Sequence, residues 1–65
     1  MEEKRKYSLR ELRARMNWTQ KETADKLGVS LPTYNAWEKD ISNVAVSKVN
    51  AVASLFGVGL DEIAF

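Results

Sequence analysis

The sequence has no cysteine and no histidine, which excludes disulfide bonds and the usual ligand sets for zinc and haem. Apolar runs are short, so neither a transmembrane segment nor a signal peptide is expected. Histidine, cysteine and convergent carboxylate pairs carry most acid–base and nucleophilic catalysis, and none is available here. We therefore expect a cytoplasmic protein that is not an enzyme and has no cofactor, no metal, no small-molecule ligand and no membrane partner.

The chain also has little net charge, because ten Lys and Arg residues against nine Asp and Glu residues give +1. The distribution is uneven: residues 1–26 carry eight basic and five acidic side chains, whereas residues 27–65 carry two and four. Sixty-five residues suffice for one domain, which we place at residues 8–65. Residues 1–7 are predicted to form a basic, flexible N-terminal arm, which is either a solvated end or a segment that contacts phosphate.

Helical patterns account for nearly all of the sequence, and no segment alternates as a strand does. Three helix starts are marked by residues that can cap them, namely Ser8, Thr19 and Ser30. The first two are capping boxes, completed by a glutamate three residues later. A fourth helix is predicted to end at Gly57, and a last short helix to cover roughly residues 60–65, so the expected fold is all-α with five helices. The predicted inward stripes are Leu9, Leu12 and Met16 in the first helix, Thr23, Ala24 and Leu27 in the second, and Val46, Val49, Val52, Ala53 and Phe56 in the fourth.

A tight turn between the second and third helices is the most informative feature. Ala24 is small enough to let the third helix approach, and Gly28 can adopt the left-handed conformation that ends a helix. Val29 then points back into the angle between the helices, while Tyr34 and Trp37 set the buried side of the third helix. This pattern predicts a helix-turn-helix, whose second helix protrudes and fits the major groove of DNA.

Rotation by 100° per residue divides the third helix into a buried and an outward face. The outward residues are Pro32, Asn35, Ala36 and Lys39. Glu38 falls at the flank of the buried side, and Arg13 flanks the buried stripe of the first helix in the same way. Two opposite charges at the margins of the core suggest an ion pair.

Matches in register extend over about Ser8 to Phe65. They are Leu9, Leu12 and Arg13, then Thr19 and Gln20, Ala24, Leu27 to Ser30, Thr33, Tyr34, Trp37 and Glu38, and finally Ala53, Phe56 to Val58 and Leu60 to Ile63. In these residues the sequence resembles the phage-repressor and Cro type of helix-turn-helix regulators, also called the xenobiotic-response-element type. The resemblance implies a compact, five-helix, lambda-repressor-like domain that binds operator DNA, often as a homodimer, in bacterial or phage gene regulation.

The resemblance also implies roles for individual residues. Thr19 and Gln20, at the start of the second helix, would meet a phosphate through side chain and backbone N–H. Arg13 and Glu38 are expected to form a structural ion pair between the first and third helices. The residues expected near base edges, on a recognition helix of about Leu31 to Lys39, are Leu31, Pro32, Thr33, Asn35 and Ala36. Lys39, at the end of this helix, and the loop through Ser42 and Asn43 are expected to touch the DNA backbone.

Several residues depart from the family's pattern. Leu31, Pro32 and Ala36 stand where related repressors frequently carry long polar side chains, which are the main readers of guanine and adenine. Asn35 can still pair with adenine. Asp40 stands where a glycine usually ends the helix, and its carboxylate would repel phosphate. We therefore expect modest affinity or an A·T-leaning site, and the loss of DNA binding stays open as an alternative.

Two functions remain open at this stage. The first is sequence-specific binding of double-stranded operator DNA by a transcriptional repressor that forms a homodimer. The second is a protein-interaction module, antitoxin-like or anti-repressor-like, that uses the apolar face of the third helix. Leu55, Val58 and Phe65 are predicted to leave an apolar patch, which is either a homodimer interface or ordinary exposure.

Overall fold

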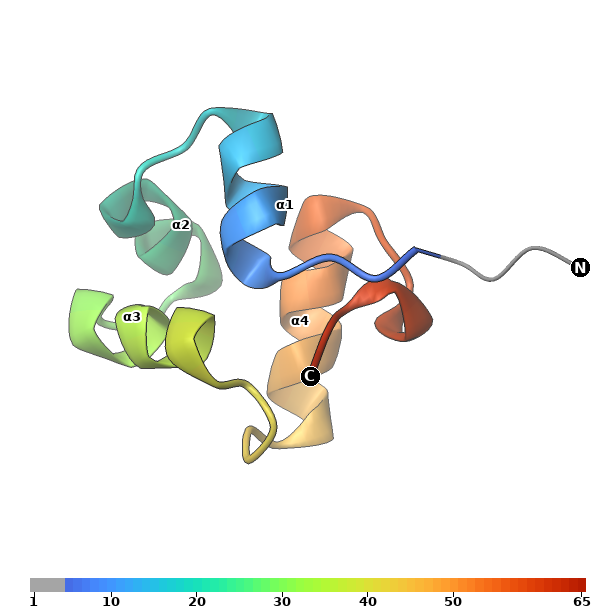
Figure 1. Cartoon of the computed structure of the whole chain (residues 1–65). Coiled ribbons are helices and arrows are strands. Elements are labelled where there is room, and N and C mark those ends of the chain that lie inside the picture. Colours follow the sequence, from blue (N-terminus) through green and yellow to red (C-terminus); the bar gives the residue numbers. More distant parts are fainter. Residues whose placement is uncertain (1–4) are drawn as a thin grey trace, which may run out of the picture.

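The computed structural model describes residues 5–65, which form four α-helices and one short 3₁₀ helix. The helices are α1 (Leu9–Met16), α2 (Gln20–Leu27), α3 (Leu31–Lys39) and α4 (Val46–Phe56), and η1 (Leu60–Glu62) follows them. α1 packs beside α4, and α2 and α3 project together to one side (Figure 1). Within residues 5–65 there is no strand, and no helix is long and apolar enough to cross a membrane. The predicted all-α fold is confirmed.

The starts of α1 and α2 follow the predicted local chemistry. The Ser8 hydroxyl accepts a hydrogen bond from the Glu11 N–H (3.1 Å), and the Glu11 carboxylate accepts one from the Ser8 N–H (3.0 Å). Thr19 and Glu22 form the same reciprocal pair. In each pair the hydrogen bond from the backbone lowers the pKa of the glutamate. Both capping boxes are confirmed, and they satisfy N–H groups that a helix start leaves without an intrahelical partner.

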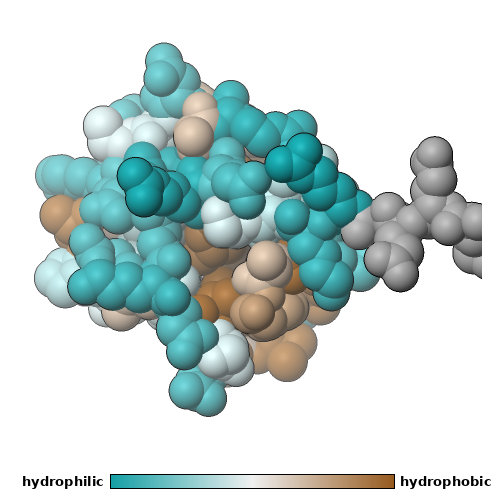
Figure 2. Space-filling model, in the orientation of Figure 1, coloured by the Kyte–Doolittle hydropathy of each residue, from teal (hydrophilic) through white to brown (hydrophobic). Residues whose placement is uncertain are grey.

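An apolar core supplied by all four α-helices, with Ile41 and Ile63 from outside them, holds the domain together. Its buried members are Leu9, Leu12, Ala24, Tyr34, Ile41, Val49, Val52, Ala53, Phe56 and Ile63. Trp18 packs against this core, with its ring centroid 6.0 Å from that of Phe56. Figure 2 shows a mostly hydrophilic surface over α1, α2 and α3, and hydrophobic residues gathered around the C-terminal end of the chain.

Two predicted core residues and the last predicted helix are wrong. Val46 is 66% exposed and Met16 is 40% exposed, although the sequence places both on inward stripes. Val46 is the first residue of α4 and Met16 is the last residue of α1. The predicted helix over residues 60–65 forms only the three residues of η1, because Ile63 is extended and completely buried. The domain therefore has four α-helices and a 3₁₀ helix in place of five helices.

Tyr7 joins the beginning of the described chain to its end. Its N–H donates to the Glu62 carbonyl, and its own carbonyl accepts from the Ala64 N–H, both at 2.8 Å. These bonds form an isolated parallel bridge between Tyr7 and Ile63. Of the predicted N-terminal arm, residues 1–4 lie outside the described residues, and Tyr7 is bonded to the domain.

Candidate nucleic-acid interface

The corner between α2 and α3 is built as the sequence predicts. Gly28 ends α2 in the left-handed conformation (φ 72°), and the Val29 N–H donates to the Ala24 carbonyl (3.0 Å). Ala24 and Tyr34 are completely buried, so α3 packs closely against α2. α3 consequently lies at the margin of the domain, with one face open to solvent (Figure 1).

The exposed residues in the first turns of α3 are mostly apolar. Leu31 is 42% exposed, and Pro32, Thr33 and Ala36 are exposed as well. The Thr33 hydroxyl accepts a hydrogen bond from the Ser30 hydroxyl (2.9 Å), which caps the helix. A helix of this kind fits the width of the major groove, where its methyl groups would meet those of thymine.

The N-terminus of α2 carries backbone donors that no residue from 5 to 65 uses. The Thr19 N–H is bonded to Glu22, but no acceptor among residues 5–65 is bonded to the N–H groups of Gln20 and Lys21. Together with the positive end of the helix dipole, such groups form an anion site. The Gln20 side-chain amide is already bonded to two residues of α3. A phosphate at this site would therefore meet the backbone of Gln20.

Arg13 on α1 and Glu38 on α3 form an ion pair beside this site. Nε and Nη2 of Arg13 donate to the two carboxylate oxygens, the second at 3.3 Å, and Nη1 donates to the Trp18 carbonyl (3.0 Å). The two side chains are only 18% and 7% exposed. Burial raises the pKa of Glu38, but the polar groups of Arg13, Tyr34 and Gln20 act in the opposite direction and leave the pKa below its ordinary value. The carboxylate is therefore ionised at neutral pH.

A polar hollow of about 280 Å³ lies over the ion pair. Its lining residues are Arg10, Arg13, Gln20, Glu38 and Lys39. Sequence reasoning did not single out Arg10, which is exposed and makes no hydrogen bond or ion pair with any residue that the structure describes. The signal that could have identified Arg10 is its spacing, because a residue three positions before Arg13 lies on the same side of the helix. Arg10 therefore joins the candidate interface.

Lys39 ends α3 with a positive charge, and Asp40 follows it with a negative charge. The Asp40 carboxylate accepts hydrogen bonds from the Ser42 N–H (2.9 Å) and the Ser42 hydroxyl (2.6 Å), and these bonds lower the pKa of Asp40. Lys39 and Asn43 are exposed, and in the described part of the chain their side chains make no hydrogen bond. Lys39 and Asn43 are thus open to a phosphate, whereas a phosphate at Ser42 would meet a carboxylate.

Comparison with known proteins agrees with this architecture. A family model described as helix-turn-helix matches residues 9–63, which include all four helices and η1. The chain belongs to the Cro and phage-repressor type of helix-turn-helix family. A curated relative, a propionyl-CoA carboxylase regulator of Cereibacter sphaeroides, is 42% identical to this helix-turn-helix domain over 55 residues. The match covers 85% of this chain but only 12% of the relative, and no solved structure matches the chain.

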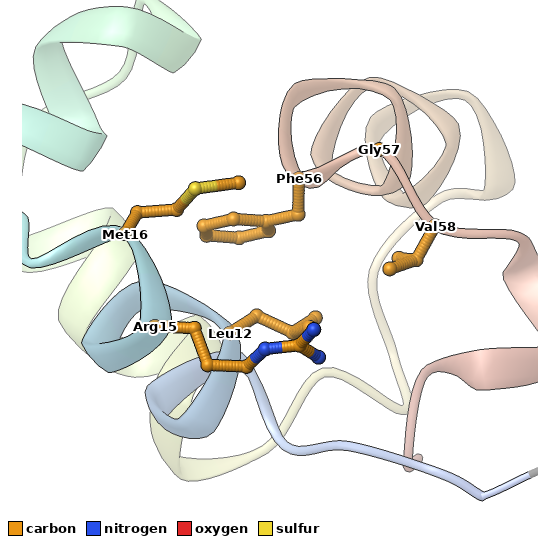
Figure 3. Close-up of a pocket in the computed structure, with 6 residues that line it drawn as sticks. All are labelled: Leu12, Arg15, Met16, Phe56, Gly57 and Val58. Atoms are coloured by element: carbon orange, nitrogen blue, oxygen red, sulfur yellow. The ribbon is translucent and has the colours of Figure 1, made fainter.

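This helix-turn-helix domain has a second hollow, of about 210 Å³, between the C-terminal ends of α1 and α4. Its lining residues are Leu12, Arg15, Met16, Phe56, Gly57 and Val58 (Figure 3). The lining is mainly apolar, and the Arg15 side chain extends beside Leu12 (Figure 3). No residue of α2 or α3 contributes to this hollow. In residues 5–65 no group of three Asp or Glu side chains could hold a metal ion.

Proposed function

We propose that this chain binds double-stranded DNA, with α3 in the major groove and the N-terminus of α2 against a backbone phosphate. The observation that carries the proposal is the proximity of two features, the unused N–H groups of Gln20 and Lys21 and the exposed face of the adjacent α3. Arg10 and Lys39 add positive charge around the polar hollow beside them. A helix start favours phosphate, and a helix packed beside it can then reach the base edges.

The proposed contacts fall into two groups. Backbone contacts are assigned to Thr19, Gln20, Lys39, Ser42 and Asn43, with Arg10 added from the structure. Base contacts are assigned to Leu31, Pro32, Thr33, Asn35 and Ala36. Only Thr33 and Asn35 of the second group carry polar side chains, so phosphate contacts would supply most of the affinity and few base pairs would be read directly.

We further propose that the chain acts as a repressor that occludes promoters in the bacterial cytoplasm or nucleoid. The relative of Cereibacter sphaeroides is named as a regulator, and its match to this chain lies within the DNA-binding domain proposed here. The chain spans only 12% of that relative, so the regulatory role is inferred from this domain alone.

We propose a homodimer on a two-fold symmetric site, with its two α3 helices about one helical turn apart. Phe65 is 65% exposed and Leu55 and Val58 are half-buried, and these three residues are the proposed interface. Sedimentation at micromolar concentration, with and without DNA, is expected to show a dimer. A monomer under both conditions would contradict this part of the proposal.

One observation favours a second candidate function. Leu31 is exposed at the start of α3, and its neighbours Pro32 and Ala36 offer no hydrogen-bonding side chain. A face of this kind suits an apolar surface on another protein, as in an antitoxin-like or anti-repressor-like module. In that case DNA and the partner protein would compete for α3, or DNA would not bind.

Selection from random duplexes at low salt tests the DNA-binding proposal. An enriched motif would support it, whereas the absence of any motif would contradict it and favour the protein-interaction module. Lys39→Ala is expected to weaken binding to all duplexes and to reduce the slope of log affinity against log salt by about one. The matched control is Lys26→Ala, which also removes one positive charge. Lys26 lies near the C-terminal end of α2, away from the proposed phosphate site at the N-terminal end, so this variant is expected to change binding little.

A further inference from the structure

Four side chains from three helices form a continuous hydrogen-bonded chain, here called the polar relay: Arg13, Glu38, Gln20 and Asn35. Arg13 holds the Glu38 carboxylate from α1. The Gln20 amide donates through Nε2 to Glu38 Oε1 (2.9 Å) and accepts through Oε1 from Asn35 Nδ2 (3.2 Å). All four residues are half-buried. The polar relay therefore connects the ion pair to the one side-chain amide of α3.

The donors and acceptors of the polar relay can be arranged in only one order. An ionised carboxylate accepts hydrogen bonds and donates none, so Gln20 must turn its NH₂ group toward Glu38. The carbonyl oxygen of Gln20 then faces Asn35, which must respond with its own NH₂ group. Turning either amide over would place two acceptors against each other. The charge on Glu38 thus fixes the orientation of two amides.

This orientation decides what Asn35 presents outside the protein. One Nδ2 hydrogen is held by Gln20, and no residue in the described part of the chain is bonded to the second hydrogen or to Oδ1. A donor beside an acceptor matches the N7 and N6 groups of adenine, whereas Oδ1 would repel the O6 atom of guanine. If the amide turned over, its NH₂ group would face the N6 amino group of adenine and Oδ1 would face N7, so both adenine contacts would be lost. The orientation of Asn35 therefore distinguishes adenine from guanine.

We propose that Gln20 and Glu38 are positioning residues that set the orientation of Asn35, and hence a preference for adenine over guanine at the base pair that Asn35 reads. The inference rests on the DNA-binding function proposed above. It gives the Gln20 side chain a role in base selectivity that is separate from the phosphate contact of the Gln20 backbone. It also gives Glu38 a role in addition to its ion pair, although neither side chain touches a base.

Gln20→Met tests the proposal directly. Methionine has a similar length but no amide to hold Asn35, while residue 20 keeps its backbone N–H and the Arg13–Glu38 pair remains. The probes are the duplex that the wild-type chain selects and the same duplex with G·C in place of A·T where Asn35→Ala alters the preference. We expect the wild type to prefer A·T by about ten-fold, within the range that one bidentate pair supplies, and Gln20→Met by about two-fold.

Two further variants separate positioning from folding. Because Gln20 acts through Asn35, the double variant Gln20→Met with Asn35→Ala is expected to show the same preference as Asn35→Ala alone. Glu38→Gln introduces an amide that can donate or accept, so the polar relay can run in either direction and the preference is expected to fall. A loss of folded protein would weaken binding to both duplexes equally and leave their ratio unchanged.

The possible failures are distinguishable. If Gln20→Met keeps the wild-type preference, or if Asn35→Ala alters the preference at no base pair, the positioning role is overturned while DNA binding stands. If the wild-type chain selects no duplex at all, the proposed function is overturned and this inference with it.

Discussion

Removing the Arg13 guanidinium should cost this small domain a large part of its stability. Arg13→Ala breaks two hydrogen bonds to a carboxylate that is 7% exposed and one to the Trp18 carbonyl. Removing one partner of a buried ion pair costs about 3–5 kcal/mol, and we expect about 3 kcal/mol because Arg13 itself is 18% exposed. A chain of this size has a free energy of unfolding of roughly 3–10 kcal/mol. The melting temperature should therefore fall by about 15 °C.

The pH dependence of this loss tests its cause. In the wild type the pKa of Glu38 is lowered, so Glu38 contributes stability that is present above its ordinary pKa of 4.5 and is lost as the pH falls through the lowered value. In Arg13→Ala the effect of burial, which raises the pKa, is no longer opposed by the guanidinium. Gln20 and Tyr34 still lower the pKa of Glu38, but this pKa should be higher in the variant than in the wild type, so the ionised carboxylate contributes less stability to the variant. The difference in stability between wild type and variant should consequently narrow from pH 7 toward pH 4.5.

Thermal and chemical unfolding followed by circular dichroism from pH 7 to pH 4 would measure both effects. Arg10→Ala is the matched control, because it removes the same charge from an exposed position on α1. A stability loss no larger than that of Arg10→Ala would refute the reasoning. A difference in stability between Arg13→Ala and the wild type that stays constant over this pH range would also refute it.

Two other predictions concern the corner between α2 and α3. Gly28→Ala should destabilise the domain by about 1 kcal/mol, because residue 28 has φ 72°, and an unchanged midpoint of denaturant unfolding would contradict this. Gln20→Pro should bind the selected duplex about ten-fold more weakly than Gln20→Ala, since both lose the side-chain amide but only proline lacks the N–H. Proline is tolerated at the first helical position, and Thr19 is already extended (φ −77°, ψ 165°), so equal affinities measured by fluorescence anisotropy would refute the phosphate contact.

The sequence was most informative where structure depends on near neighbours. The capping box at Ser8 and the helix end at Gly28 involve residues within four positions of one another, so their chemistry is visible in the sequence. Ile63 is a different case, because its extended conformation depends on Tyr7, whose backbone is bonded to its neighbours. No periodicity within residues 60–65 could reveal that pairing.

In the candidate site, too, some contacts could be predicted from the sequence and others depended on how the helices pack. The marginal positions of Arg13 and Glu38 suggested a pair across 25 residues, and the structure places their charged groups in contact. Helical geometry could say only that Asn35 points away from the core. It could not say that Gln20 reaches Asn35 from α2, because that contact depends on how closely the two helices pack. The direction of the polar relay became visible only with all its members in place.

The bridge between Tyr7 and Ile63 has a mechanical consequence. Because the two segments are parallel, the chain before Tyr7 and the chain after Ile63 depart in opposite directions. A force that pulls on both ends would load the two backbone hydrogen bonds in shear at the same time, instead of opening them one after the other. The completely buried Ile63 side chain would have to leave the core in the same step. The ends of this helical domain would therefore act as a small clamp against stretching.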